Sequence, residues 1–175
     1  NIKNSVSLCN QLLIGEDQLT NSHRLLSLDV TNLYCNVPII ESIKILRIQL
    51  QKSKKLSKSE VKELVNMVTI ILNQNYFCYQ NEFYKFNEGV AMGGPLSGTI
   101  ANIFMNFFEE TYIMNESNPF FRRLYFYGRY VDDTICITDL NDTEILHMNE
   151  YINNCKTSIS FVTELGDKTL NFLDL

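Results

Sequence analysis

The chain lacks several features that would place it at once in a common protein class. Its five cysteines include no C-x-x-C pair, so the sequence indicates neither a zinc site nor a disulfide framework, and their odd number suits a reducing compartment. No stretch reaches the roughly 18 consecutive apolar residues of a membrane span. Neither a signal peptide nor an internal repeat is visible. We therefore expect an intracellular protein, nuclear or cytoplasmic, with no membrane segment.

Positive charge is also scarce. Lysine and arginine number 15 against 20 aspartate and glutamate residues, which gives a net charge of −5. Proteins that bind nucleic acid commonly carry a basic surface that neutralises phosphates, so the composition alone argues against such a partner. The one basic cluster, with four lysines in residues 52–58, is typical of a solvated loop between helices.

Tryptophan is absent, but 11 Phe and 9 Tyr residues and a hydrophobic content of 45% provide for a sizeable core in a chain whose length suits one domain. The first residue is Asn1, and the last residues continue an apolar strand pattern. We expect residues 1–175 to form a partial domain of a longer protein.

The spacing of apolar residues predicts both strands and helices. Strands or hairpins are expected at residues 25–30, 76–86, 123–138, 159–163 and 169–173. Helices are expected at residues 39–50 and after residues 57, 96 and 141. Ser57 and Glu60 have the spacing of a capping box, and Asn141 to Glu144 resembles another helix start. Helices that cover one face of an antiparallel sheet make an α+β fold.

Two adjacent carboxylates, Asp132 and Asp133, lie between apolar and β-branched residues in segment 129–137. This pattern predicts a strand, a tight turn and a returning strand. Neighbouring carboxylates repel each other unless a cation binds them, and oxygen ligands suit a divalent metal. Aspartate is also a common turn residue, and most Asp-Asp turns between strands are only turns. The pair by itself leaves both interpretations open.

A third carboxylate favours the interpretation of the Asp pair as part of a metal site. Asp29 lies at the end of the apolar run 25–30, where it could serve simply as an N-cap or a strand-end residue. However, an acid at the end of one strand and an acid pair at a neighbouring hairpin tip are the parts of a two-metal site. Such a site holds the attacking and leaving oxygens of an in-line phosphoryl displacement.

A glycine-rich segment precedes one of the predicted helices. Gly93, Gly94 and Pro95 form a loop whose backbone a ligand can approach closely. A glycine loop that leads into a helix suits a phosphate or the edge of a sugar and base. The same residues would also make an ordinary connection to a core helix.

Three segments, in this order, resemble motifs of the palm region of reverse transcriptases, most closely those of Penelope-like retroelements. Residues 27–38 (SLDVTNLYCNVP) are similar to the first catalytic block, residues 89–105 to the block that contacts template and nucleotide, and residues 129–133 (RYVDD) to the second catalytic block. Residues 160–164 and 170–174 are similar to the strands that lead into the primer grip. The resemblance implies a polymerase palm, with most of the fingers and the thumb outside this chain.

The resemblance also implies an activity, RNA-directed transfer of a nucleotide from a dNTP to a primer 3′-hydroxyl. Asp29, Asp132 and Asp133 would be the catalytic residues and, with the backbone carbonyl of Val30, would bind two Mg²⁺ ions, or Mn²⁺ in their place. The implied partners are an RNA template and a DNA primer. The fingers, the thumb and, as the resemblance allows, an endonuclease would belong to the same polyprotein.

The implied nucleotide-binding residues are Val30, Thr31, Asn32, Leu33, Tyr34, Met92 and Gly93. The backbone amides of residues 31–33 would meet the triphosphate, and Gly93 the incoming nucleotide. Tyr34 has the position of the family's sugar-discriminating ring. Lys156 and Lys168 are both candidates for the late lysine that assists pyrophosphate departure.

Two departures from the family pattern are visible. Met92 stands where many reverse transcriptases have glutamine, and Gly98 stands where proline often follows serine.

The sequence also leaves two alternative functions open. One is a viral-type RNA-dependent RNA polymerase, against which the bulky ring of Tyr34 argues, and the other is a nucleic-acid-binding remnant without catalytic activity.

Overall fold

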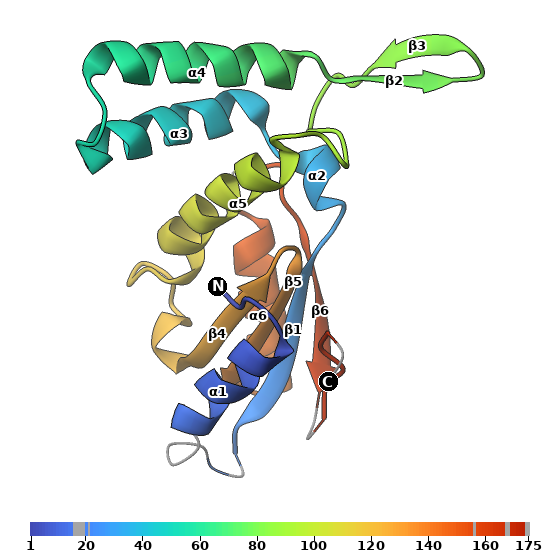
Figure 1. Cartoon of the computed structure of the whole chain (residues 1–175). Coiled ribbons are helices and arrows are strands. Elements are labelled where there is room, and N and C mark those ends of the chain that lie inside the picture. The colour runs from blue at the N-terminus through green and yellow to red at the C-terminus, as the bar shows by residue number, and fades with distance from the viewer. Residues whose placement is uncertain (16–19, 21, 156, 167–168, 174–175) are drawn as a thin grey trace. The chain divides into compact units, whose positions relative to one another are not determined.

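The structure is a computed structural model (Figure 1) and describes residues 1–15, 20, 22–155, 157–166 and 169–173. The chain divides into two compact units. The first comprises residues 1–31 and 112–175, and the second comprises residues 32–111. In the part of the chain that the structure describes, no helix is both long and apolar enough to cross a membrane.

The first unit is built on a four-stranded antiparallel sheet with the strand order β4-β5-β1-β6. The strands are β1 (Arg24–Val30), β4 (Leu124–Tyr130), β5 (Asp133–Thr138) and β6 (Phe161–Gly166). The two central strands, β1 and β5, are the most buried and are rich in the apolar and β-branched residues that fit a pleated, packed surface. The predicted strand at residues 25–30, the hairpin at residues 123–138 and the α+β class are confirmed.

Alternation along β1 divides its side chains between the two faces of the sheet. Leu26 and Leu28 lie on one face and are fully buried in the core. Ser27 and Asp29 lie on the other face, where Asp29 is half-buried. The strand therefore anchors itself by one face while it presents a carboxylate on the other.

Helix α1 (Ser5–Gly15) was not predicted, and its packing explains why one predicted strand is wrong. A hydrophobic cluster joins the N-terminal residues to the sheet and to residues 170–173; its buried members are Ile2, Leu8, Ile135 and Phe172. Residues 169–173 therefore bury their apolar side chains in this cluster instead of pairing as a strand. Gly166 lies close to residue 169, because a Cβ atom at Gly166 would lie 2.6 Å from the carbonyl oxygen of Thr169.

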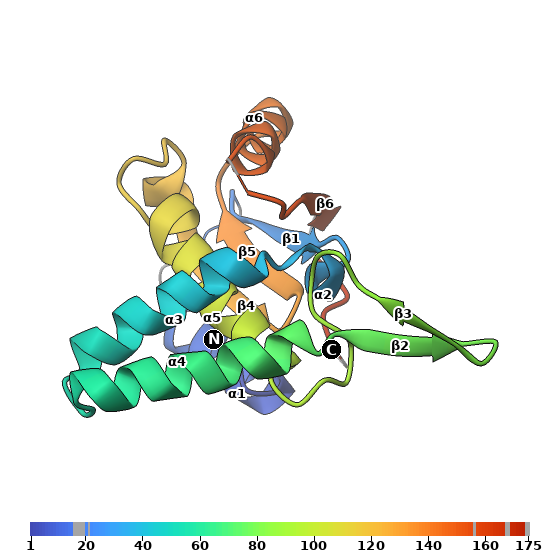
Figure 2. The same ribbon diagram turned by 90° about the horizontal axis from the view of Figure 1, so that it is seen from above.

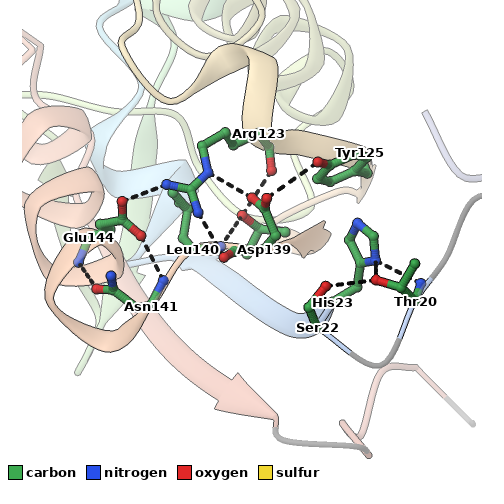
Figure 3. Close-up of polar contacts among 10 residues, drawn as sticks. Thr20, Ser22, His23, Arg123, Tyr125, Asp139, Leu140, Asn141 and Glu144 are labelled. Carbon is green, nitrogen blue, oxygen red and sulfur yellow. Dashed lines mark hydrogen bonds and ion pairs between the residues drawn. The ribbon is translucent and has the colours of Figure 1, made fainter.

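Arg123 links the start of β4 to the end of β5 and to the start of α6 (Asp142–Asn153), as Figure 3 shows. Its guanidinium donates to the side chain of Asp139 at 2.7 Å, to the backbone carbonyl of Asp139 at 2.8 Å and to Glu144. Glu144 also completes a capping box with Asn141, which confirms the predicted helix start. The hydrogen bond from Arg123 lowers the pKa of the Asp139 carboxyl, so the network is ionised at neutral pH.

The second unit contains four α-helices, a hairpin and the start of a π-helix (Glu109–Ile113) in its described residues. Figures 1 and 2 show the α-helices and the hairpin. The elements are α2 (Leu33–Asn36), α3 (Ile39–Ser53), α4 (Lys58–Asn73), β2 (Tyr76–Tyr79), β3 (Glu82–Lys85) and α5 (Ser97–Phe108). The predicted capping box of Ser57 and Glu60 is present at the start of α4. The lysines of residues 52–58 are exposed in and beside the turn between α3 and α4, as predicted.

The buried face of helix α3 differs from the predicted one. The residues expected to point inward were Ile43, Leu46 and Leu50, and all three are only half-buried. Ser42 and Ile45 are buried instead. The Ser42 hydroxyl donates to the carbonyl oxygen of Pro38 at 2.8 Å, so a polar side chain occupies a core position without losing its hydrogen bond.

The loop before α5 offers a matched pair of glycines for a stability test. Gly89 and Gly93 both have positive φ, at +75° and +79°. A Cβ atom at Gly89 would overlap the backbone carbonyl of Cys35, whereas one at Gly93 would meet nothing within 4 Å. We predict that Gly93→Ala costs about 1–2 kcal/mol of unfolding free energy, from backbone strain alone. Gly89→Ala should cost clearly more, since it adds a clash with backbone atoms. Urea unfolding of both variants checks this, and equal losses would contradict the crowding at Gly89.

Candidate active site

Asp29 is held in place by a neighbour on its own strand. Ser27, two residues earlier and on the same face of β1, donates its hydroxyl hydrogen to Asp29 Oδ1 at 2.6 Å. Ser27 is 4% exposed, so the hydrogen bond is largely shielded from water and restrains the carboxylate. Ser27 is not among the site residues predicted from the sequence. The period of two along a strand was the signal that could have found it.

Asp133 begins β5 and lies across from Asp29. The two strands pair antiparallel from Arg24 opposite Thr138 to Ser27 opposite Ile135. Extending this register by two residues sets Asp29 opposite Asp133, in agreement with the effect of the Asp29 charge on the pKa of Asp133. Residues directly opposite point to the same face, with Cβ atoms about 5 Å apart. The fold therefore brings two of the three predicted carboxylates together from strands that are distant in sequence.

Asp132 lies in the turn between β4 and β5. Tyr130 pairs with Asp133, which leaves Val131 and Asp132 as the two loop residues. The carbonyl oxygen of Asp132 accepts a hydrogen bond from the Val30 N–H at 3.2 Å. This bond ties the hairpin tip to the end of β1, so the third carboxylate lies beside the other two.

Burial and repulsion both act on the pKa of Asp133 in this cluster. Burial raises the pKa of Asp133 above its ordinary value, and the negative charges of Asp132 and Asp29 raise it further. An oxygen-only set of like charges is the donor chemistry that a hard divalent cation prefers, and a cation would offset the repulsion. Among the described residues, no three His, Cys, Asp or Glu side chains are arranged around one point as ligands of a single ion. The fit to a divalent metal therefore lies in the oxygen donors of the three carboxylates and not in a ready-made ligand arrangement.

The raised pKa of Asp133 gives a stability prediction. The folded state binds this proton more tightly than the unfolded state, whose carboxyl titrates near 3.9, so ionised Asp133 lowers stability at neutral pH. In metal-free buffer we expect Asp133→Asn to raise the unfolding free energy by about 0.5 kcal/mol at pH 7, because solvent screens much of the repulsion. The gain should shrink as the pH falls through the folded pKa and vanish below about pH 4. Urea unfolding across this range is the measurement. Glu150→Gln, at an exposed site on α6, controls for net charge, and a gain of equal size there would contradict the assignment.

Two backbone N–H groups at the end of β1 already have hydrogen-bond partners within the protein. The Val30 N–H bonds to Asp132, and the Thr31 N–H donates to the carbonyl oxygen of Ser160 at 2.9 Å. The Thr31 amide, expected at the triphosphate, therefore already has a partner. Asn32 has a φ of +47° at the start of α2, and Leu33 is buried.

The remaining predicted nucleotide contacts lie in the second unit. Met92 and Gly93 are exposed, and the space around Gly93 is open to a ligand. The carbonyl oxygen of Tyr34 accepts a hydrogen bond from Val90 N–H at 2.7 Å, which fixes Tyr34 against this loop. Its hydroxyl lies 3.9 Å from the position a Cβ atom would take at Gly98. The late lysine candidates, Lys156 and Lys168, lie outside the described residues.

Comparison with known proteins decides the family. The sequence profile of the family described as reverse transcriptase (RNA-dependent DNA polymerase) matches residues 3–163. The chain belongs to the reverse transcriptase family. Residues 3–163 include all three carboxylates and the glycine loop. Comparison with curated proteins gave no match.

Solved structures show the same fold. Apo telomerase from Candida tropicalis, truncated from its C-terminal domain, matches with a TM-score of 0.67 and 13% identity over 97% of this chain and 37% of that chain. Telomerase from Candida albicans, in complex with the TWJ fragment of telomeric RNA, matches with a TM-score of 0.69 and 13% identity over 98% of this chain and 32% of that chain. The reverse transcriptase domain thus spans about a third of the length of these structures, and at this identity the likeness concerns the fold.

Proposed function

We propose that this domain is the catalytic palm of an RNA-directed DNA polymerase encoded by a retroelement of the Penelope-like type. The proposal rests on the three carboxylates Asp29, Asp132 and Asp133, and the observation that supports it is that the negative charges of Asp132 and Asp29 act on Asp133. Membership of the reverse transcriptase family supports it. The partners would be an RNA template, a DNA primer and a dNTP, and the protein would act inside the cell, in the nucleus or cytoplasm.

The chain's own residues would prepare the site as follows. Asp29 and Asp133 would face the same side of the sheet, and the hydrogen bond from the Ser27 hydroxyl would orient Asp29. The hydrogen bond from the Val30 N–H to the carbonyl oxygen of Asp132 would hold the turn that carries Asp132. These three carboxylates, with the carbonyl of Val30, would hold two Mg²⁺ ions, or Mn²⁺. When bound, such ions lower the pKa of a primer hydroxyl and neutralise charge on the leaving pyrophosphate.

Nucleotide contacts are assigned to the second unit. The open backbone at Gly93, beside Met92, would meet the incoming nucleotide, and the amides of Asn32 and Leu33 its triphosphate. Tyr34 would exclude ribonucleotides. The net charge of −5 leaves the phosphates of template and primer to a basic surface elsewhere in a longer protein, on fingers and thumb.

Primer extension tests the proposal. The complete protein, given a DNA primer on an RNA template with dNTPs and Mg²⁺, should extend the primer, and chelation of the metal should stop it. Preferred incorporation of rNTPs would favour a viral-type RNA polymerase instead. Binding of the template and primer without incorporation, with Mg²⁺ and with Mn²⁺, would identify a non-catalytic remnant.

A further inference from the structure

The turn that carries Asp132 contains a residue in an unfavourable backbone conformation. Val131 has a φ of +58°, in the left-handed region that β-branched residues rarely adopt. Of the two loop residues between Tyr130 and Asp133, only Val131 has positive φ. Hairpin turns with positive φ at the first loop position alone strongly favour glycine there. A contact from outside the loop must therefore stabilise Val131 in this conformation.

Arg129 makes such a contact. Arg129 is 2% exposed, and its Nη1 donates a hydrogen bond to the carbonyl oxygen of Val131 at 2.8 Å. A guanidinium bonded to a carbonyl is a charge-assisted hydrogen bond, which is stronger than a neutral one, and burial protects it from water. The backbone of Arg129 is itself fixed, because it pairs with Thr134 and its carbonyl oxygen accepts from the Ile2 N–H at 2.9 Å.

The carbonyl that Arg129 binds belongs to the peptide group between Val131 and Asp132. If Val131 returned to negative φ, this peptide would rotate and carry the carboxylate of Asp132 with it. On the far side, the carbonyl oxygen of Asp132 accepts the longer hydrogen bond from the Val30 N–H, at 3.2 Å. We propose that Arg129 is a positioning residue, which keeps the turn in the conformation that directs Asp132 toward Asp29 and Asp133. The inference rests on the proposed catalytic role of Asp132.

A double-mutant cycle in the complete protein tests this role. Arg129→Met removes the donor at similar length, and Val131→Gly removes the cost of positive φ. We expect Arg129→Met to lower kcat about 100-fold, the size of effect that a small misplacement in an active site produces. It should also raise the Mg²⁺ concentration for half-maximal activity and leave KM for template and primer nearly unchanged. In the Val131→Gly background the same substitution should lower kcat less than about tenfold, because the turn no longer needs the arginine.

Two further variants keep the cycle interpretable. Arg122→Met makes the same chemical change at a side chain that is 85% exposed, and it should leave kcat and the Mg²⁺ requirement unchanged. Arg129→Lys keeps the buried charge and a donor without the planar fork. The kcat of Arg129→Lys should lie between those of wild type and Arg129→Met. If Arg129→Met does not fold, Arg129→Lys takes its place in the cycle.

Crystal structures of the Arg129 variants decide the question independently of activity. We expect Val131 to leave positive φ in Arg129→Met, or in Arg129→Lys if only that variant folds. A φ that stays near +58°, or equal losses of kcat in the two backgrounds, would overturn the inference. A wild-type protein that cannot extend a primer would overturn the proposed function instead, and the φ of Val131 would still show whether Arg129 holds the turn.

Discussion

Asp132→Asn and Asp29→Asn, each introduced into the complete protein, should lower primer extension at least about 1,000-fold, since metal-assisted stabilisation of a phosphoryl transition state is worth several kcal/mol. Asparagine has nearly the shape of aspartate, so packing is preserved while one ligand charge is lost. The unfolding free energy should hold or rise slightly, because each change relieves repulsion within the cluster that raises the pKa of Asp133.

The matched control is Asp142→Asn. Asp142 lies at the start of α6 with its side chain 77% exposed, and in the sequence it is outside the segments that carry Asp29, Asp132 and Asp133. The substitution should leave the rate of extension within about twofold of wild type, as expected for a surface position. Near wild-type extension by Asp29→Asn or Asp132→Asn, or an equal loss in Asp142→Asn, would show that these carboxylates are not the catalytic centre.

The parts of the fold that the sequence predicted are those with local signals. The alternation of β1 and the apolar runs around Asp132 and Asp133 follow from the period of two in a strand. The capping boxes at Ser57 and Asn141 depend on residues three positions apart, so they too could be predicted from local sequence. To predict that Asp29 and Asp133 lie close together, the order of the motifs along the chain was also required. Local pattern alone does not determine which strands are neighbours in a sheet.

The errors came from segments whose structure depends on distant partners. Residues 169–173 alternate like a strand, but Phe172 is buried in a cluster with Ile2 and Leu8, and no local signal distinguishes the two outcomes. Arg129 was read only as part of a motif. Arg129 is buried and bonds to the Val131 carbonyl, and the positive φ at Val131 is one that a valine gives no reason to expect.

Tyr34→Ala should raise the ratio of ribonucleotide to deoxynucleotide incorporation by about 100-fold, near the upper range of what the shape of a pocket alone achieves. The ring is half-buried, and its backbone is fixed to the glycine loop by the bond from Val90. If the incoming sugar lies on this ring, a 2′-hydroxyl must displace it, so exclusion is steric and a shorter side chain removes it. Deoxynucleotide incorporation should remain substantial, because the carboxylates are unchanged.

Tyr34→Phe separates the ring from the hydroxyl. It keeps the bulk that would exclude a 2′-hydroxyl and removes only the group near Gly98, so its ratio should stay close to that of wild type. Both variants are measured by single-nucleotide extension with matched rNTP and dNTP concentrations. If Tyr34→Ala still polymerises with an unchanged ratio, Tyr34 is a packing residue, and the preference for deoxynucleotides must come from another side chain.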